Sequence, residues 1–161
     1  MKNCLSFCSR QFFIKSGLWN KIVLILIFYV KMIEYIMDKS VKKILIVDDE
    51  RPIARALELK LINSGFQAEI AKNGTEAVDK IKSGGFDMIL LDLVLPGIDG
   101  FTILQKAKEE IKTKTPIIVL SNLSQTDDIK KAKALGAIDF LVKSNTPVSE
   151  IVNKIKKYFN L

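Results

Sequence analysis

The sequence lacks histidine entirely and has only two cysteines, Cys4 and Cys8, among its 161 residues. The absence of histidine excludes histidine-ligated metals and acid–base catalysis by an imidazole. Because both cysteines lie within the first eight residues, the rest of the chain can provide neither an internal disulfide nor a thiol nucleophile, which suits a reducing cytoplasm. The chemistry that remains is that of oxygen and ammonium groups.

The main part of the chain also lacks a concentration of positive charge. The formal net charge is +7, but residues 1–36 hold five basic residues and one acidic residue. Residues 37–161 hold 20 basic and 17 acidic residues, interspersed along the sequence. Since binding to a phosphate backbone needs clustered cationic side chains, we expect no direct nucleic-acid partner.

Long hydrophobic runs are absent as well. The run at 22–30 has nine residues, bracketed by Lys21 and Lys31, whereas a transmembrane helix needs about 20. No small-residue cleavage motif of a signal peptide follows it. We interpret residues 1–36 as an extension upstream of a true translation start at Met37, with Met32 as the other candidate start. The alternatives are an interfacial membrane anchor, which would bring the chain to a membrane only if this segment is expressed, and a cleaved signal.

Residues 37–161 are expected to form one domain, in which short aliphatic runs alternate five times with amphipathic stretches of helical length. The predicted strands are 43–48, 67–71, 87–92, 116–120 and 138–142. The predicted helices are 52–64, 75–83, 100–112, 125–135 and 148–159. This alternation predicts an α/β fold, a doubly wound, five-stranded parallel sheet with helices on both faces. Ligands of such sheets bind at the carboxyl ends of the strands.

Polar residues stand at the carboxyl ends of four of these predicted strands. The first strand ends in Asp48, Asp49 and Glu50, and the third ends in Asp92. If these strands are neighbours, as in the flavodoxin-like order 2-1-3-4-5, the carboxylates converge and need a cation to remain ionised together. An all-oxygen site suits Mg²⁺ beside a phosphate. Ser121 and Lys143, after the fourth and fifth strands, would then contact phosphoryl oxygens.

The same residues lie in motifs that resemble the receiver domain of two-component response regulators. The motifs are ILIVDDE at 44–50, LLDLVLPGIDG at 90–100, IVLS at 118–121 and GAIDFLVK at 136–143. Each motif alone is common, but the four occur in order and at the family's spacing. The resemblance covers nearly all of residues 40–161.

The resemblance implies a phosphoryl-transfer site. Asp92 would accept a phosphoryl group from a sensor histidine kinase, a phosphotransfer protein or a small phosphodonor. Asp48, Asp49 and Asp92 would hold Mg²⁺ together with the backbone carbonyl of Val94. The protein would be a phosphoacceptor, with possible self-catalysed phosphorylation and dephosphorylation, and not an enzyme in the usual sense.

The resemblance also implies a switch. Ser121 would be the hydroxyl that moves onto the phosphoryl group, Lys143 the lysine of the pocket, and Phe140 the aromatic residue that changes rotamer with Ser121. A downstream protein would then bind the face formed by the fourth helix, the fifth strand and the fifth helix. Because the chain stops at Leu161, soon after the fifth predicted helix, we expect a stand-alone receiver.

Four positions near the site bear on this interpretation. Ser144 stands where the family usually has proline, and Asn122 where it prefers a small residue. Both favour the alternative of a degenerate receiver that binds partners without phosphorylation, whereas the intact Asp92 argues against it. Val94 and Leu123 occupy family positions that influence the hydrolytic water, and neither side chain can hydrogen-bond it. We therefore predict a long-lived phosphorylated Asp92.

Overall fold

The computed structural model describes residues 23–31 and 41–161. Residues 23–31 are helical, and within the described residues no helix is both long and apolar enough to cross a bilayer. Residues Val41–Leu161 form a compact unit of their own. The expected start at Met37 lies outside the described residues, so the boundary at this position stays a prediction.

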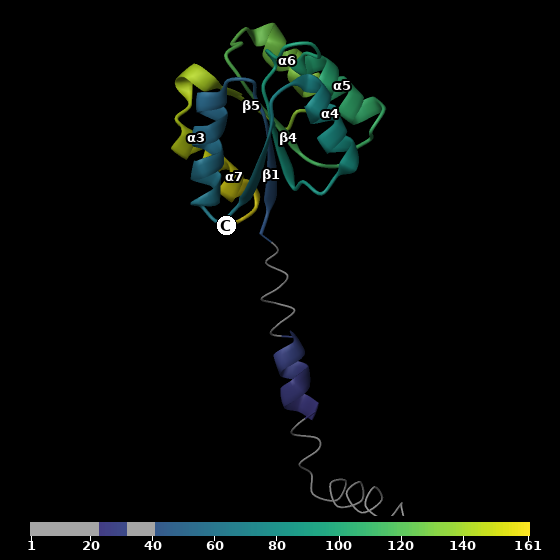
Figure 1. The fold of residues 1–161 in the computed structure, drawn as a ribbon, viewed down its shortest axis with the longest axis vertical. Helices are drawn as coiled ribbons and strands as arrows, with labels where there is room; N and C mark the ends of the chain where they lie inside the picture. Colours follow the sequence, from purple (N-terminus) through teal and green to yellow (C-terminus); the bar gives the residue numbers. More distant parts are fainter. Residues whose placement is uncertain (1–22, 32–40) are drawn as a thin grey trace, which may run out of the picture. The chain divides into compact units, whose positions relative to one another are not determined.

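All ten predicted strands and helices are present in this unit (Figure 1). In chain order they are β1 Lys43–Val47, α3 Arg51–Ile62, β2 Gln67–Ala71, α4 Gly74–Ser83, β3 Met88–Leu91, α5 Gly100–Glu109, β4 Ile117–Ser121, α6 Thr126–Ala134, β5 Asp139–Val142 and α7 Val148–Tyr158. A 3₁₀ turn that was not predicted, η1 Lys143–Asn145, lies between β5 and α7. The ends differ from the prediction by three residues at most. The largest difference is at the end of α5, where Lys112 has φ 54°, a conformation that cannot continue a right-handed helix.

The sheet has the strand order β2-β1-β3-β4-β5, and all its pairs are parallel. The predicted flavodoxin-like topology is therefore confirmed. In the register of β1 and β3, Val47 lies opposite Leu91. The next residues along these two strands, Asp48 and Asp92, consequently leave the same edge of the sheet side by side.

Helices cover both faces of the sheet, as Figure 1 shows. Ile44 and Ile46 of β1 pack in the core beneath α3 and α7, whereas Leu45 and Val47 pack in the core beneath α4, α5 and α6. Successive side chains of a strand point to opposite faces. A strand buried on both faces is thus continuously apolar, which is why the aliphatic runs located the three central strands, β1, β3 and β4.

Two glycines allow the loop after β3 to pack closely against α4 and α5. A Cβ added at Gly100 would lie 2.3 Å from the carbonyl oxygen of Asp92, and one added at Gly74 would lie 2.2 Å from the carbonyl oxygen of Ile98. Real side chains do not approach backbone atoms so closely. The first residues of α5 and α4 are therefore packed directly against this loop, and only glycine permits these contacts.

Candidate functional site

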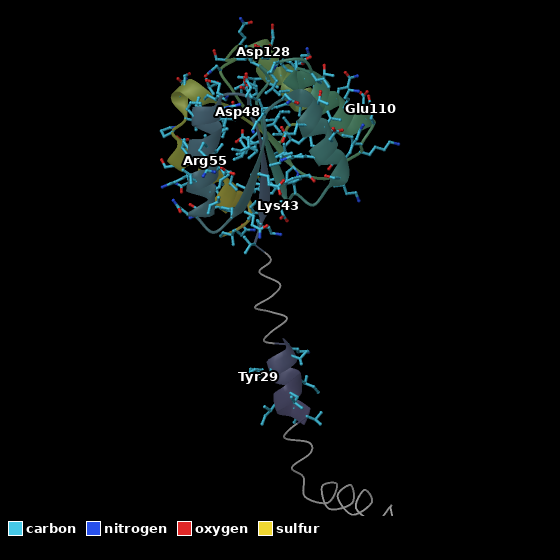
Figure 2. All side chains as sticks on the ribbon, in the orientation of Figure 1. Tyr29, Lys43, Asp48, Arg55, Glu110 and Asp128 are labelled. Carbon is cyan, nitrogen blue, oxygen red and sulfur yellow. The ribbon has the colours of Figure 1, made fainter. Side chains whose placement is uncertain are left out.

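Two buried aspartates stand at adjacent strand ends. Asp48 is 2% exposed and Asp92 is 4% exposed. The amide of Asp92 donates to the carbonyl of Val47 at 2.9 Å, so the hydrogen-bond ladder of the sheet extends to the site. Asp49 is exposed, and one carboxylate oxygen from each of the three aspartates lies within 4.8 Å of the others. Figure 2 shows Asp48 at the opposite end of β1 from Lys43.

Lys143 lies among these acids with a side chain that is only 4% exposed. Its Nζ is 2.6 Å from Oδ2 of Asp92, 2.8 Å from Oδ2 of Asp48 and 3.1 Å from Oε1 of Glu50. Burial by itself would lower the pKa of Lys143, but the hydrogen bonds to Asp48 and Asp92 outweigh it and raise the pKa above its ordinary value. Lys143 is therefore a permanent ammonium group.

The negative charge around this ammonium group is larger than one cation can offset. Burial raises the pKa of Asp48, while the hydrogen bond and charge of Lys143 oppose that rise. Asp92 adds to the rise by repulsion. A hard divalent cation bound by the aspartate oxygens would relieve this repulsion, which is the donor chemistry that Mg²⁺ prefers.

The backbone fixes the orientation of both buried carboxylates. The amide of Glu50 donates to Oδ1 of Asp48 at 2.9 Å, and the amide of Val94 donates to Oδ1 of Asp92 at 3.0 Å. Each aspartate thus uses Oδ1 for a backbone amide and Oδ2 for Lys143. The backbone therefore pre-organises both buried carboxylates.

Ser121 supplies a buried hydroxyl at the end of β4. Its side chain is 0% exposed, and its Oγ has no hydrogen-bond partner among residues 41–161. A buried polar atom without a partner costs about 1–3 kcal/mol. A phosphoryl oxygen held near Asp92 would provide the missing partner. This orphaned hydroxyl and the all-oxygen donor set both fit a site for Mg²⁺ and a phosphoryl group.

The structure gives less direct support for the predicted roles of Phe140 and Val94. Phe140 is partly buried and packs against the core beneath α4, α5 and α6, on the strand that pairs with β4. The side chain of Val94 is 57% exposed. The structure thus brings Asp48, Asp49, Asp92 and Lys143 together, while the switching role of Phe140 and metal binding by the Val94 carbonyl stay predictions. None of the described peptide bonds is cis, and Ser144, which stands in place of the family's proline, favours the trans form.

Sequence reasoning missed the contact between Glu50 and Lys143. Glu50 ends the acidic run at the end of the first predicted strand, and that position in the sequence indicates no role for it. The two residues are 93 positions apart in the sequence. The only signal in the sequence is that both residues follow predicted strands, whose carboxyl ends lie at the same edge of the sheet.

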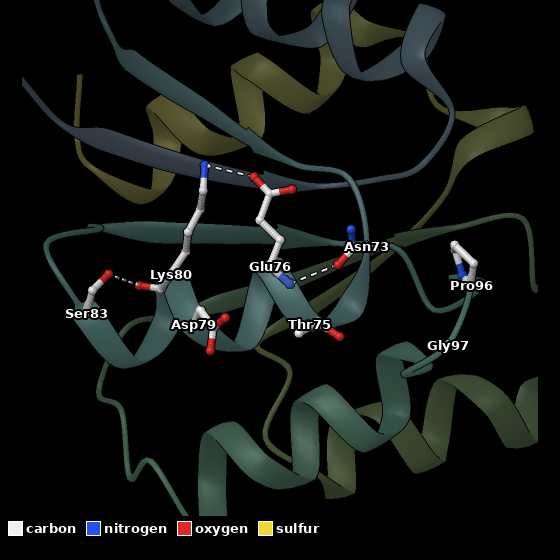
Figure 3. A pocket seen from close by; sticks show the side chains of 8 residues that line it. All are labelled: Asn73, Thr75, Glu76, Asp79, Lys80, Ser83, Pro96 and Gly97. Carbon is white, nitrogen blue, oxygen red and sulfur yellow. Dashed lines mark hydrogen bonds and ion pairs between the residues drawn. The ribbon is translucent and has the colours of Figure 1, made fainter.

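A wide hollow of about 800 Å³ lies beside the site and not at the acidic cluster (Figure 3). It lies between α4 and the loop after β3. Several of its polar side chains already have partners: Asn73 accepts from the amide of Glu76, Ser83 donates to the carbonyl of Lys80, and Nζ of Lys80 lies 3.4 Å from Oε1 of Glu76. The acidic cluster, whose charges are unbalanced, is therefore the stronger functional candidate.

The comparisons with known proteins agree with this geometry. Residues 44–156 match the family model described as the response regulator receiver domain. The response regulator ArlR of Staphylococcus haemolyticus is 40% identical over 100 residues, which cover 62% of this chain and 45% of that protein. The uncharacterized transcriptional regulatory protein YkoG of Bacillus subtilis is 35% identical over 113 residues, or 70% and 49% of the two chains.

A solved structure shows the same fold. In the CheX–CheY–BeF₃–Mg²⁺ complex from Borrelia burgdorferi, the matched chain is 28% identical with a TM-score of 0.69, and the alignment covers 76% of this chain and 92% of that one. The chain spans about half the length of the curated relatives it matches. The family model covers well over half of the chain, and this protein therefore belongs to the family of response regulator receiver domains.

Proposed function

We propose that this receiver domain accepts a phosphoryl group on Asp92 in a Mg²⁺-dependent reaction and signals through partner binding. The observation that carries the proposal is the surplus of buried negative charge. Asp48 and Asp92 share one ammonium group with Glu50, and the hydroxyl of Ser121 nearby has no partner among residues 41–161. A divalent cation and a phosphoryl group together satisfy both features.

The transfer is a displacement at phosphorus. A carboxylate oxygen of Asp92 forms the new O–P bond while the P–N bond of a donor phosphohistidine, or the P–O bond of a small donor, breaks. The leaving group departs with the electron pair. Lys143 and the Ser121 hydroxyl donate hydrogen bonds to the transferred oxygens, which adds stabilisation where charge develops. Bound Mg²⁺, held by Asp48, Asp49, Asp92 and the Val94 carbonyl, would supply further neutralisation of that charge.

The comparisons support this assignment by analogy. The Borrelia burgdorferi complex contains BeF₃ and Mg²⁺ with its receiver-fold protein, and we infer that the same kind of ligand set fits here. The natural donor would be a sensor histidine kinase or a phosphotransfer protein in the cytoplasm. The downstream protein would bind the face formed by α6, β5 and α7. Phe140 lies on β5, and Ser121 lies on the neighbouring strand β4.

The test is the intact mass of the purified protein after incubation with acetyl phosphate, with and without Mg²⁺, for the wild type and Asp92→Asn. We expect a gain of one phosphoryl group that requires Mg²⁺ and is lost in the variant. An unmodified wild type would contradict the proposal and would favour an interaction module that works without phosphorylation. Modification of Asp92→Asn to the same extent would exclude Asp92 as the acceptor.

A further inference from the structure

We propose that Glu50 is a positioning residue that holds Lys143 in the resting site and is the partner that Lys143 exchanges for the phosphoryl group. This inference rests on the proposed phosphorylation of Asp92. It assigns a regulatory role to a side chain that neither binds the metal in our proposal nor reacts. In this role Glu50 restrains phosphorylation by anionic donors.

The coordination of Lys143 is complete in the resting structure. A lysine ammonium group has three N–H donors, and three carboxylates lie within 3.1 Å of Nζ. A phosphoryl oxygen can therefore contact Lys143 only after one of these carboxylates has left. The identity of the leaving partner decides how easily the site accepts a donor.

Glu50 is the partner that leaves most easily. Asp48 and Asp92 are nearly inaccessible to water, and a backbone amide fixes each of their carboxylates. The side chain of Glu50 is 46% exposed, so its carboxylate can return to water when the contact breaks. Exposed ion pairs contribute little to stability, whereas separating buried ones leaves an uncompensated charge. Lys143 consequently keeps its two buried partners and releases Glu50.

Within residues 41–161, the side chain of Glu50 forms its hydrogen bond and ion pair with Lys143 and with no other residue. Glu50 is the N-cap residue of α3, where a side chain that caps the exposed amides would be expected. Its side chain makes no capping hydrogen bond. The carboxylate instead contacts Lys143, a residue from the far end of the domain sequence. The helix start positions Glu50, and the side chain is available for the lysine.

A charge at this place has two effects on an incoming donor. It repels anionic phosphodonors from the site, and it competes with their oxygens for Lys143. Removing the charge should therefore accelerate phosphorylation, most strongly for a dianionic donor and at low ionic strength. Screening by salt should reduce the difference, because Glu50 is partly exposed to solvent.

The experiment measures the phosphorylation rate of the full chain at saturating Mg²⁺, with acetyl phosphate and with the less anionic phosphoramidate, at low and high salt. The variants are Glu50→Gln and the matched control Glu110→Gln. Glu110 is likewise an exposed glutamate 3.1 Å from a lysine Nζ, but it lies at the far end of α5, whose ten residues span about 15 Å. Both variants lose one negative charge.

We expect Glu50→Gln to react about three- to tenfold faster than the wild type with acetyl phosphate at low salt. The gain should be smaller with phosphoramidate and at high salt, and Glu110→Gln should react at the wild-type rate. An unchanged or slower rate for Glu50→Gln with both donors would overturn the inference, as would an equal acceleration in Glu110→Gln. A wild type that is not phosphorylated at all would instead contradict the proposed function.

Discussion

Two aspartates at the two ends of β3 have the same kinds of partner and opposite surroundings. Asp87, just before the strand, accepts hydrogen bonds from Nζ of Lys42 and from the amide of Lys43, both at 2.9 Å. Asp92, just after it, accepts from Nζ of Lys143 at 2.6 Å and from the amide of Val94 at 3.0 Å. The list of partners alone would give both residues the same role.

The difference between the two ends is the balance of charge. At the amino end of β3, one lysine forms an ion pair with one carboxylate, which is 33% exposed. At the carboxyl end of β3, one lysine forms ion pairs with three carboxylates, two of which are buried. A balanced pair holds the fold together, whereas a buried surplus of one sign needs a ligand of the other sign. The ratio of charges, and not the presence of an ion pair, distinguishes the functional end of the strand.

The largest expected effect comes from removing the lysine at each end. Lys143→Met leaves buried carboxylates without their cation and should lower the free energy of unfolding by about 3–5 kcal/mol. Lys42→Met, which removes a partly exposed lysine, should lower it by about 0–1 kcal/mol. Denaturant unfolding without divalent metal measures both. Equal losses of unfolding free energy in the two variants would show that burial and surplus charge do not make the carboxyl end of β3 different from its amino end.

Neutralising the aspartates should change stability in opposite directions. Asp87→Asn weakens two charge-assisted hydrogen bonds and should lower the free energy of unfolding by about 1–2 kcal/mol. Asp92→Asn relieves repulsion among the acids and should raise it by roughly 1 kcal/mol without metal. Addition of Mg²⁺ should stabilise the wild type more than Asp92→Asn. A loss of stability in both variants would contradict the inference that the carboxylates around Lys143 repel one another.

The apolar side chain of Val94 should prolong the phosphorylated state at the carboxyl end. Val94→Asn or Leu123→Glu adds a group that can hydrogen-bond an attacking water, and we expect the decay of the phosphorylated protein to accelerate by roughly three- to tenfold. Val41→Asn is the matched control, because Val41 is an exposed valine before the start of β1 (51%, against 57% for Val94). If the phosphorylated forms of both test variants decay at the wild-type rate, this prediction is wrong.

The smallest effect concerns pH and the amino end. Burial alone would raise the pKa of Asp87, but hydrogen bonds from Lys43 and Lys42 outweigh it and lower the pKa from its ordinary value of 3.8. A carboxylate with a lowered pKa contributes stability above the unfolded pKa and loses it as the pH falls through the folded value. Unfolding measured below about pH 4 should therefore show a loss in the wild type that is smaller in Asp87→Asn. The same pH dependence in both proteins would assign the loss to other acids.

The fold and the core of the site were predictable because they depend on local patterns. Continuous aliphatic runs located β1, β3 and β4. The polar residues Asp48, Asp92 and Lys143, which follow β1, β3 and β5, met at one edge of the sheet as expected. The partners of Glu50 and Asp87 were not predictable. Asp87 was expected as the first residue of a strand, yet β3 begins at Met88 and the Asp87 carboxylate binds the start of β1. Such contacts depend on how separate segments meet in space.

The absence of side chains at Gly74 and Gly100 bears on how a change at Asp92 can spread. Both ends of the loop after β3 pack directly against the first turns of α4 and α5, so this side of Asp92 leaves little room for the backbone to shift. On the other side, the hydroxyl of Ser121 has no hydrogen-bond partner among residues 41–161, and the ring of Phe140 is only partly buried. We therefore expect a structural change at Asp92 to be transmitted toward β4 and β5 and not toward α4 and α5.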